Sequence, residues 1–242
     1  MFGLGTIVNV IAIVAGGLIG LLLKGGMKEH YQTAIIRTMG LATIFIGASG
    51  TLPGLLVVEN GVLVSTPIKD TLCMILALAL GTFIGEWLDF DGRLERLGAW
   101  LKEKATRGDD NRFIEGFVTA SLTVCIGAMA IVGAIEDGIQ GDPSILLTKS
   151  VLDLIIIAVM TCSMGKGCVF SAIPVAVLQG SVTCFAKLIQ PIMTEAALAN
   201  LSLVGSVLIF CVGINLVWDK RIRVANLLPA IVIAVAAAFL PI

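Results

Sequence analysis

The sequence predicts an all-α fold, a polytopic transmembrane helical bundle of about eight spans, and its composition, hydropathy and run lengths support this. Hydrophobic residues make up 57% of the 242-residue chain and charged residues only 14%, against about 25% charged residues in a typical soluble domain. The mean hydropathy is +1.03. A soluble protein of this size has too little interior for so many apolar side chains, and a disordered chain would be polar. We therefore expect the lipid bilayer to be the main apolar solvent of this chain.

Apolar runs of about 20 residues, the length that crosses a bilayer, divide the chain into the expected spans. They are residues 4–23, 33–52, 71–88, 113–135, 145–164, 167–189, 198–218 and 224–242. The first run begins almost at Met1, with no basic segment before it and no cleavage site after it, so we expect a retained helix rather than a signal peptide. We expect a single transmembrane domain over residues 1–242.

The basic residues predict the orientation of these spans, because cytoplasmic loops carry an excess of Lys and Arg. Thirteen of the 16 Lys and Arg residues lie in or beside the first, third, fifth and seventh loops. The other loops hold Lys69, Lys149 and Lys187. The odd loops are therefore expected to be cytoplasmic, with both termini outside.

The third loop contains one amphipathic segment. Leu94, Leu97, Leu101 and Ala105 recur at helical spacing, with Trp100 beside them and Lys and Arg around them. This pattern predicts a cytoplasmic helix over about residues 91–106 that lies in the membrane interface. Docking of a partner protein on the same helix is the alternative.

An internal repeat relates residues 4–52 to residues 71–135. Gly16-Gly17-Leu18-Ile19-Gly20 returns 65 residues later as Gly81-Thr82-Phe83-Ile84-Gly85, and Ile46-Gly47-Ala48 returns as Ile126-Gly127-Ala128. Small residues let membrane helices approach closely, so we expect helix packing at these glycines. They are Gly16, Gly20, Gly47, Gly81, Gly85 and Gly127. Packing within one chain and packing in a homo-oligomer both stay open.

The sequence contains little that suggests an enzyme. Gly47-Ala48-Ser49-Gly50 resembles the serine motif of intramembrane proteases, but the one histidine, His30, falls near the opposite end of the same expected span. Neither a zinc-protease motif nor a nucleotide-binding loop is present, and the six cysteines form no C-x-x-C pair. We expect no catalysis, cofactor or metal. The net charge of −1 gives no general attraction to nucleic acid.

Isolated polar residues in the apolar spans are the candidate site. Asp153 and Gln179 fall near the same depth in neighbouring spans, and a carboxyl group there costs about 2.5 kcal/mol or more. Gly165-Lys166-Gly167 and Pro174 join these spans, either as a tight cytoplasmic turn or as a broken helix that lines a cavity. The expected solute path is lined by Asp153, Gln179, Lys166, Ser171 and Asn9. Hydrogen bonding between helices is the alternative role for Asn9.

Several stretches resemble one family, the YdfK/YqgA-type bacterial membrane proteins, whose function is unknown. They are GLGTIVN at residues 3–9, GGLIG at residues 16–20, the region of Gly47, and SAIPVAVLQGS at residues 171–181. The resemblance covers essentially the whole chain and implies a bacterial inner-membrane protein, often described as a transporter. It implies neither a substrate nor catalytic residues.

These observations predict a secondary or passive transporter or channel for a small solute or ion, with the lipid bilayer as its surroundings. The alternative is a membrane scaffold that does not transport and that recruits partners through its cytoplasmic loop, residues 93–104 above all.

Overall fold

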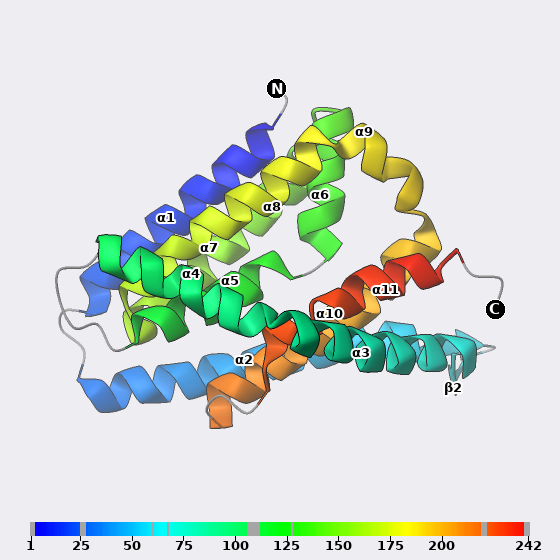
Figure 1. Cartoon of the computed structure of the whole chain (residues 1–242), viewed down its shortest axis with the longest axis horizontal. Coiled ribbons are helices and arrows are strands. Elements are labelled where there is room, and N and C mark those ends of the chain that lie inside the picture. The colour runs from blue at the N-terminus through cyan, green and yellow to red at the C-terminus, as the bar shows by residue number, and fades with distance from the viewer. Residues whose placement is uncertain are drawn as a thin grey trace. The chain divides into compact units, whose positions relative to one another are not determined.

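The chain forms two compact units, and Figure 1 labels the helices of which they are built. The structure is a computed structural model that describes residues 3–24, 28–59, 61–66, 68–105, 112–126, 128–218 and 222–239. The first unit comprises residues 1–39, 92–125 and 129–189, and the second comprises residues 40–91, 126–128 and 190–242. Apart from one short β-hairpin, the regular elements of the described residues are helices, which confirms the expected all-α class.

The first unit is built around α1 (Leu4–Lys24), α7 (Ser144–Met164) and α8 (Ala172–Cys184). Its other elements are α4 (Phe90–Ala105), α5 (Phe113–Cys125), α6 (Ala128–Ile139), the 3₁₀ helix η1 (Lys166–Ser171) and α9 (Ala186–Ile189). The most extensive packing joins α1 and α7, which run parallel, and α8 runs antiparallel to α1. The polar residues of three apolar helices therefore meet along α1.

Two glycines let α1 lie directly against the backbone of α7. A Cβ atom at Gly16 would overlap the carbonyl oxygen of Leu154, and one at Gly20 would overlap that of Ala158. Any larger residue would push the helices apart, as expected for membrane helices that associate through small residues.

The chain between α7 and α8 turns within a few residues. Gly165 ends α7 with φ of 93°, a left-handed conformation that favours glycine, and η1 follows at once. Pro174 lies in the first turn of α8, where a missing backbone N–H is tolerated. Of the two conformations that the sequence allows for this segment, the structure has the tight turn, with a 3₁₀ helix.

The fourth expected span is broken. The helices α5 and α6 are bent by 61° relative to each other, since α5 ends at Cys125 and α6 begins at Ala128. The end of α5 nearer the break, at Cys125, lies near Lys149 and Asp153 of α7. A discontinuous helix beside buried charged residues is a common arrangement in membrane transporters.

The second unit contains α2 (Glu29–Leu55) from Gly40 onward, α3 (Ile68–Leu88), α10 (Glu195–Trp218) and α11 (Pro229–Ala237), with the 3₁₀ helices η2 (Gln190–Ile192) and η3 (Val224–Leu227). Glycines again mediate the contacts. A Cβ atom at Gly81 would overlap the backbone of Ala230 in α11, and one at Gly85 would overlap the carbonyl oxygen of Asn226 in η3. Gly47 brings α2 within contact of the backbone of Phe210 in α10. Gly127 lies outside the described residues.

A β-hairpin follows α2, in a stretch where the expected spans leave only a loop. Strands β1 (Leu56–Glu59) and β2 (Val62–Ser65) pair antiparallel, with Leu56 opposite Ser65 and Glu59 opposite Val62. The two residues between the strands are an Asn-Gly pair, a sequence typical of two-residue hairpin turns, and Gly61 has φ of 78°.

Six of the described helices are long and apolar enough to span a membrane, and the bent pair α5–α6 raises the number to seven. The eighth expected span forms a shorter apolar segment, Val224–Ala237, so the count of eight stays a prediction. The sixth expected span corresponds to the candidate span Lys166–Cys184, which begins with η1 and continues as α8, and α9 follows it. The helix expected at residues 91–106 forms as α4.

Candidate functional site: a buried polar cluster in the first unit

Four polar side chains from three helices are buried together in the first unit, and we call them the buried polar cluster. They are Asn9 of α1, Lys149 and Asp153 of α7, and Gln179 of α8. Their relative exposures are 0, 7, 3 and 1%, respectively. Asp153 lies nine residues into the 21-residue α7, about 13 Å along its axis, which places the cluster well inside the expected span.

The charged half of the buried polar cluster is an ion pair within α7. The Lys149 ammonium group donates to both Asp153 carboxylate oxygens, at 2.7 and 2.6 Å. The spacing of four residues places both side chains on one face of the helix. Two opposite charges make the pair neutral, which reduces the cost of holding either charge away from water.

The amide half of the buried polar cluster joins α1 to α8. The Asn9 Nδ2 atom donates to Gln179 Oε1 at 3.1 Å, and the Asn9 side chain also interacts with the Asp153 carboxylate. Asn9 Oδ1 and Gln179 Nε2 have no hydrogen-bond partner within the described part of the chain. A buried polar atom without a partner costs about 1–3 kcal/mol, so one donor and one acceptor are available to a bound molecule.

Further polar contacts extend from the cluster toward the first turn of α1. The Asp137 carboxylate of α6 accepts the backbone N–H groups of Gly5 and Thr6, at 3.0 and 3.3 Å. A carboxylate at a helix N-terminus is stabilised by the helix dipole as well as by these bonds. The Thr6 and Thr183 hydroxyl groups form a hydrogen bond of 3.1 Å. Thr183 is four residues from Gln179, so both lie on one face of α8.

A half-open hollow of about 270 Å³ lies at the same end of the first unit. Its lining residues are Gly138, Thr183, Cys184, Phe185, Lys187 and Leu188. The volume is slightly below the range of pockets for drug-sized molecules and suits a smaller solute. Thr183 belongs both to this lining and to the chain of polar contacts that leads to Gln179, so the hollow is a candidate access route to the cluster.

The structure brings together three of the five residues expected to line a solute path. Asn9, Gln179 and Asp153 belong to the buried polar cluster, whereas Lys166 and Ser171 do not. Lys166 is exposed at the start of η1, beyond the end of α7 at Met164, which lies about 16 Å along the α7 axis from Asp153. The Ser171 hydroxyl donates locally to the carbonyl oxygen of Cys168 at 2.7 Å.

Sequence reasoning missed two members of this arrangement. The distribution of basic residues places Lys149 with a loop, although it falls inside the expected fifth span, four residues before Asp153. That spacing could have identified it as the ion-pair partner. Asp137 lies just past the expected end of the fourth span at residue 135, where no buried residue is expected, whereas the structure buries it completely.

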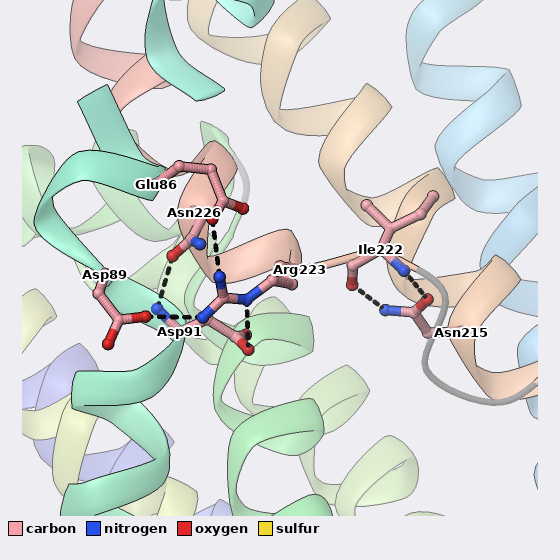
Figure 2. Close-up of polar contacts among 7 residues, drawn as sticks. All are labelled: Glu86, Asp89, Asp91, Asn215, Ile222, Arg223 and Asn226. Carbon is pink, nitrogen blue, oxygen red and sulfur yellow. Dashed lines mark hydrogen bonds and ion pairs between the residues drawn. The ribbon is translucent and has the colours of Figure 1, made fainter. Parts of the chain in front are cut away.

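A second group of polar contacts lies in the second unit, around Arg223 (Figure 2). The Arg223 guanidinium group contacts the carboxylates of Glu86 and Asp89 at 2.7 and 2.6 Å and that of Asp91 at 3.6 Å. The Asp91 backbone N–H donates to Asn226 Oδ1 at 2.7 Å. These contacts tie the turn after α3 to η3. Nearly half of the Arg223 side chain is exposed, as expected for a surface clamp rather than a binding site.

In the same unit, the Asn215 side chain forms two hydrogen bonds with the backbone of Ile222, two residues before η3. Its Nδ2 atom donates to the carbonyl oxygen of Ile222 at 2.7 Å, and the Ile222 N–H donates to its Oδ1 atom at 2.9 Å (Figure 2). The Asn215 amide therefore fixes the Ile222 backbone beside α10.

The amphipathic helix α4 exposes part of its apolar face. Leu97 and Trp100 are 40 and 51% exposed, and the Lys104 ammonium group lies 4.9 Å from the centre of the Trp100 ring. Exposed apolar and aromatic residues beside basic ones suit either the membrane interface or a protein partner.

Comparisons with known proteins identify the family of this chain. A family model described as "Protein of unknown function (DUF554)" matches residues 4–239. The uncharacterized membrane protein YdfK of Bacillus subtilis (strain 168) is 29% identical over 235 residues, covering 97% of this chain and 95% of YdfK. The uncharacterized protein YqgA of Escherichia coli (strain K12) is 30% identical over 235 residues, covering 96% of this chain and 94% of YqgA. No solved structure matches the chain.

Proposed function

This chain belongs to the DUF554 family and is a membrane protein, and from that premise we propose that it is a secondary or passive transporter, or a channel, for a small solute or ion. The observation that supports this is the buried polar cluster. Polar and ionisable groups inside a membrane are costly and mark solute or ion pathways in many membrane proteins.

The composition of the cluster favours a binding role over helix packing alone. If packing were the purpose, apolar side chains of similar volume would serve at least as well as the Lys149–Asp153 pair. The two unpartnered amide atoms, Asn9 Oδ1 and Gln179 Nε2, add a cost that a bound solute would offset. The half-open hollow beside Thr183 supplies a route from one end of the unit.

Thermal unfolding of the purified protein in detergent tests the proposal against a panel of ions and small metabolites. A ligand at about 100 times its dissociation constant stabilises the folded state by about 2.7 kcal/mol. We expect one class of compound to raise the unfolding temperature of the wild type, and Asp153→Asn to abolish that shift. Glu115→Gln, the same chemical change at an exposed site on α5, should leave it intact. If no compound of the panel changed the unfolding temperature and none of them crossed liposomes that contain the protein, transport would be contradicted.

We propose a bacterial inner membrane as the location, with odd loops in the cytoplasm and both termini outside. The distribution of Lys and Arg supports this orientation. A reporter enzyme that works only in the cytoplasm, fused after Ile242, should be inactive, and one that works only outside should be active. The reverse result would contradict the orientation and leave the transport proposal standing.

The second candidate is a scaffold that recruits partners through α4, favoured by the exposed Leu97 and Trp100. Trp100→Ser separates the two functions. It should abolish partner capture by a scaffold, whereas it should leave solute-dependent stabilisation of a transporter unchanged.

A further inference from the structure

The buried polar cluster combines one positive charge, one negative charge and two unpartnered amide atoms. The Lys149–Asp153 pair is neutral as it stands, with both carboxylate oxygens accepting from the ammonium group. A net charge in a membrane-spanning segment is costly, so an ion can bind here only if the total charge stays near zero. An ion can therefore enter only together with a second charge that compensates its own.

The surroundings of the hollow favour an anion over a cation. Lys187 is the charged member of its lining. The Asp137 carboxylate, which is buried and outside that lining, accepts the N–H groups of Gly5 and Thr6 through Oδ2, and its Oδ1 atom has no hydrogen-bond partner among the described residues. Further along the polar contacts, the available donors are Gln179 Nε2 and the Lys149 ammonium group. A positive charge at the mouth of a site concentrates anions and speeds their arrival.

The remaining unpartnered atom indicates a second group on the ligand. Asn9 Oδ1 is an acceptor, so a molecule that satisfies both amides must also donate a hydrogen bond. A carboxylate has no donor, but a hydroxyl group beside it supplies one. Because the Asn9–Gln179 bond leaves one donor and one acceptor whichever way the two amides are oriented, this requirement does not depend on that assignment.

Resting on the transport function proposed above, we propose that the buried polar cluster binds a small hydroxycarboxylate anion together with one proton, and that the two cross the membrane as a neutral unit. The proton binds a carboxylate oxygen of Asp153, which becomes neutral and releases Lys149. The anion then neutralises the Lys149 ammonium group and accepts a hydrogen bond from Gln179 Nε2, and its hydroxyl group donates to Asn9 Oδ1. The cluster is neutral both empty and loaded.

Asp153 is the carboxyl group placed to accept this proton. Among the described residues, α7 itself contributes Lys149, α1 contributes the uncharged Asn9, and α8 contributes the uncharged Gln179. The α5 helix contributes the Cys125 thiol, which lies near the pair and carries no charge. Three further charged groups lie on neighbouring elements of the unit. Asp137 of α6 binds the first turn of α1, and Lys166 of η1 and Glu115 of α5 are exposed.

The test is lactate flux into phosphatidylcholine liposomes that contain the full-length protein and a trapped pH-sensitive dye. Sodium L-lactate is added outside at equal pH. Wild-type protein should acidify the interior faster than protein-free liposomes, which report the passive diffusion of lactic acid. Because the transported unit is neutral, clamping the membrane potential with potassium and valinomycin should not change the rate.

Variants assign this signal to the cluster. Asp153→Asn should reduce acidification to the protein-free rate, and Glu115→Gln should leave it at the wild-type rate. Lys187→Gln should slow uptake and weaken its dependence on ionic strength, whereas Lys69→Gln, an exposed lysine outside the hollow, should not. Lys187 is exposed, so its variant keeps the test valid even if Asp153→Asn does not fold.

Ligand discrimination tests the hydroxyl contact. In detergent, lactate should bind about tenfold or more tightly than propionate, which lacks the hydroxyl group and would leave Asn9 Oδ1 without a partner. Asn9→Ala should remove that preference, because the acceptor is gone. Equal binding of lactate and propionate by the wild type would overturn this part of the proposal.

The outcomes separate this inference from the transport function on which it rests. Lactate uptake without acidification would exclude proton coupling and keep transport. Wild-type flux of potassium ion or glycerol, with lactate at the protein-free rate, would overturn the anion class and keep transport. No flux of lactate, propionate, potassium ion or glycerol would contradict both proposals.

Discussion

Single residues set the energetics of the buried polar cluster, above all the two residues of the Lys149–Asp153 ion pair. Each charge is tolerable inside the first unit only because the other lies within 2.7 Å. Removing one partner leaves an uncompensated buried charge, whereas replacing both with apolar groups of similar volume is often neutral or stabilising.

We therefore predict that Asp153→Leu destabilises the protein by about 3–5 kcal/mol and that the double variant Lys149→Met/Asp153→Leu recovers most of this loss. Unfolding in detergent measures both. The double variant should at the same time lose solute-dependent stabilisation, which separates folding from function. If the double variant were no more stable than Asp153→Leu, the uncompensated charge of Lys149 would not be the cause of the loss.

A second residue-scale prediction contrasts the exposed and buried members of the group around Arg223. Arg223→Gln should leave the unfolding temperature nearly unchanged, because its two short pairs, with Glu86 and Asp89, are exposed and screened by water and salt, and its contact with the buried Asp91 carboxylate is longer, at 3.6 Å. Asn226→Ala should cost about 1–3 kcal/mol, since Asn226 is completely buried and its Oδ1 atom accepts from the Asp91 N–H. A larger loss for Arg223→Gln than for Asn226→Ala would contradict this ranking.

At this scale the sequence identifies candidates but not their contacts. Asp153 and Gln179 stand out because polar residues are rare in apolar runs. Asn9 joins them through a hydrogen bond between residues 170 positions apart, which no local pattern predicts. Lys149 was predictable from its spacing, whereas Lys166, which stands out by its glycine neighbours, proves to be an exposed turn residue.

At the scale of elements, helix contacts in this protein depend on glycine. Gly16 and Gly20 bring α1 against the backbone of α7, and Gly81 and Gly85 bring α3 against η3 and α11. The repeat motif marks these positions in the sequence, but the partner helices lie far along the chain and cannot be read from it.

We predict that Gly16→Ala destabilises the protein by about 1–3 kcal/mol, because its Cβ would overlap a backbone carbonyl oxygen that cannot move independently of α7. The matched control is Gly180→Ala on α8, where a Cβ atom would meet nothing within 4 Å. That change should stabilise by about 0.5–1 kcal/mol through the lost backbone freedom of glycine. Equal unfolding temperatures for the two variants would refute the packing role of Gly16.

Local chemistry explains where the elements were predictable and where they were not. The α4 helix follows from its apolar stripe, with ends close to those expected. The β-hairpin was missed because its strands are only four residues each, although the Asn-Gly turn was visible. The break between α5 and α6 was not predictable from hydropathy, because it falls in an uninterrupted apolar run.

At the scale of the whole molecule, the two units share an order of elements. In the first, a helix with a G-x-x-I-G motif, α1, packs on a long helix, a 3₁₀ turn and a shorter helix, α7–η1–α8. In the second, α3 packs on η3 and α11, which follow the long helix α10 in the same way. The sequence shows the repeat of the first half, but the matching pair in the second half is visible only in the structure.

Each unit is assembled from segments far apart in the chain, so no short fragment holds a complete one. We predict that residues 1–140 expressed alone do not form a protease-resistant fold, since α1 lacks α7. Co-expression with residues 141–242 should restore a detergent-stable complex, detected by co-purification. A monodisperse, protease-resistant fragment 1–140 would contradict this assembly.

The distance along the chain between α1 and α7 also bears on how the protein is made. At about 5–20 residues per second, synthesis of the roughly 120 residues between them takes on the order of ten seconds. During that interval α1, apolar enough to remain in the membrane by itself, holds Asn9 and its glycine face without their final partners. The newborn chain therefore passes through a stage in which a small-residue surface is exposed to lipid, where insertion factors or neighbouring proteins could shield it until α7 is released.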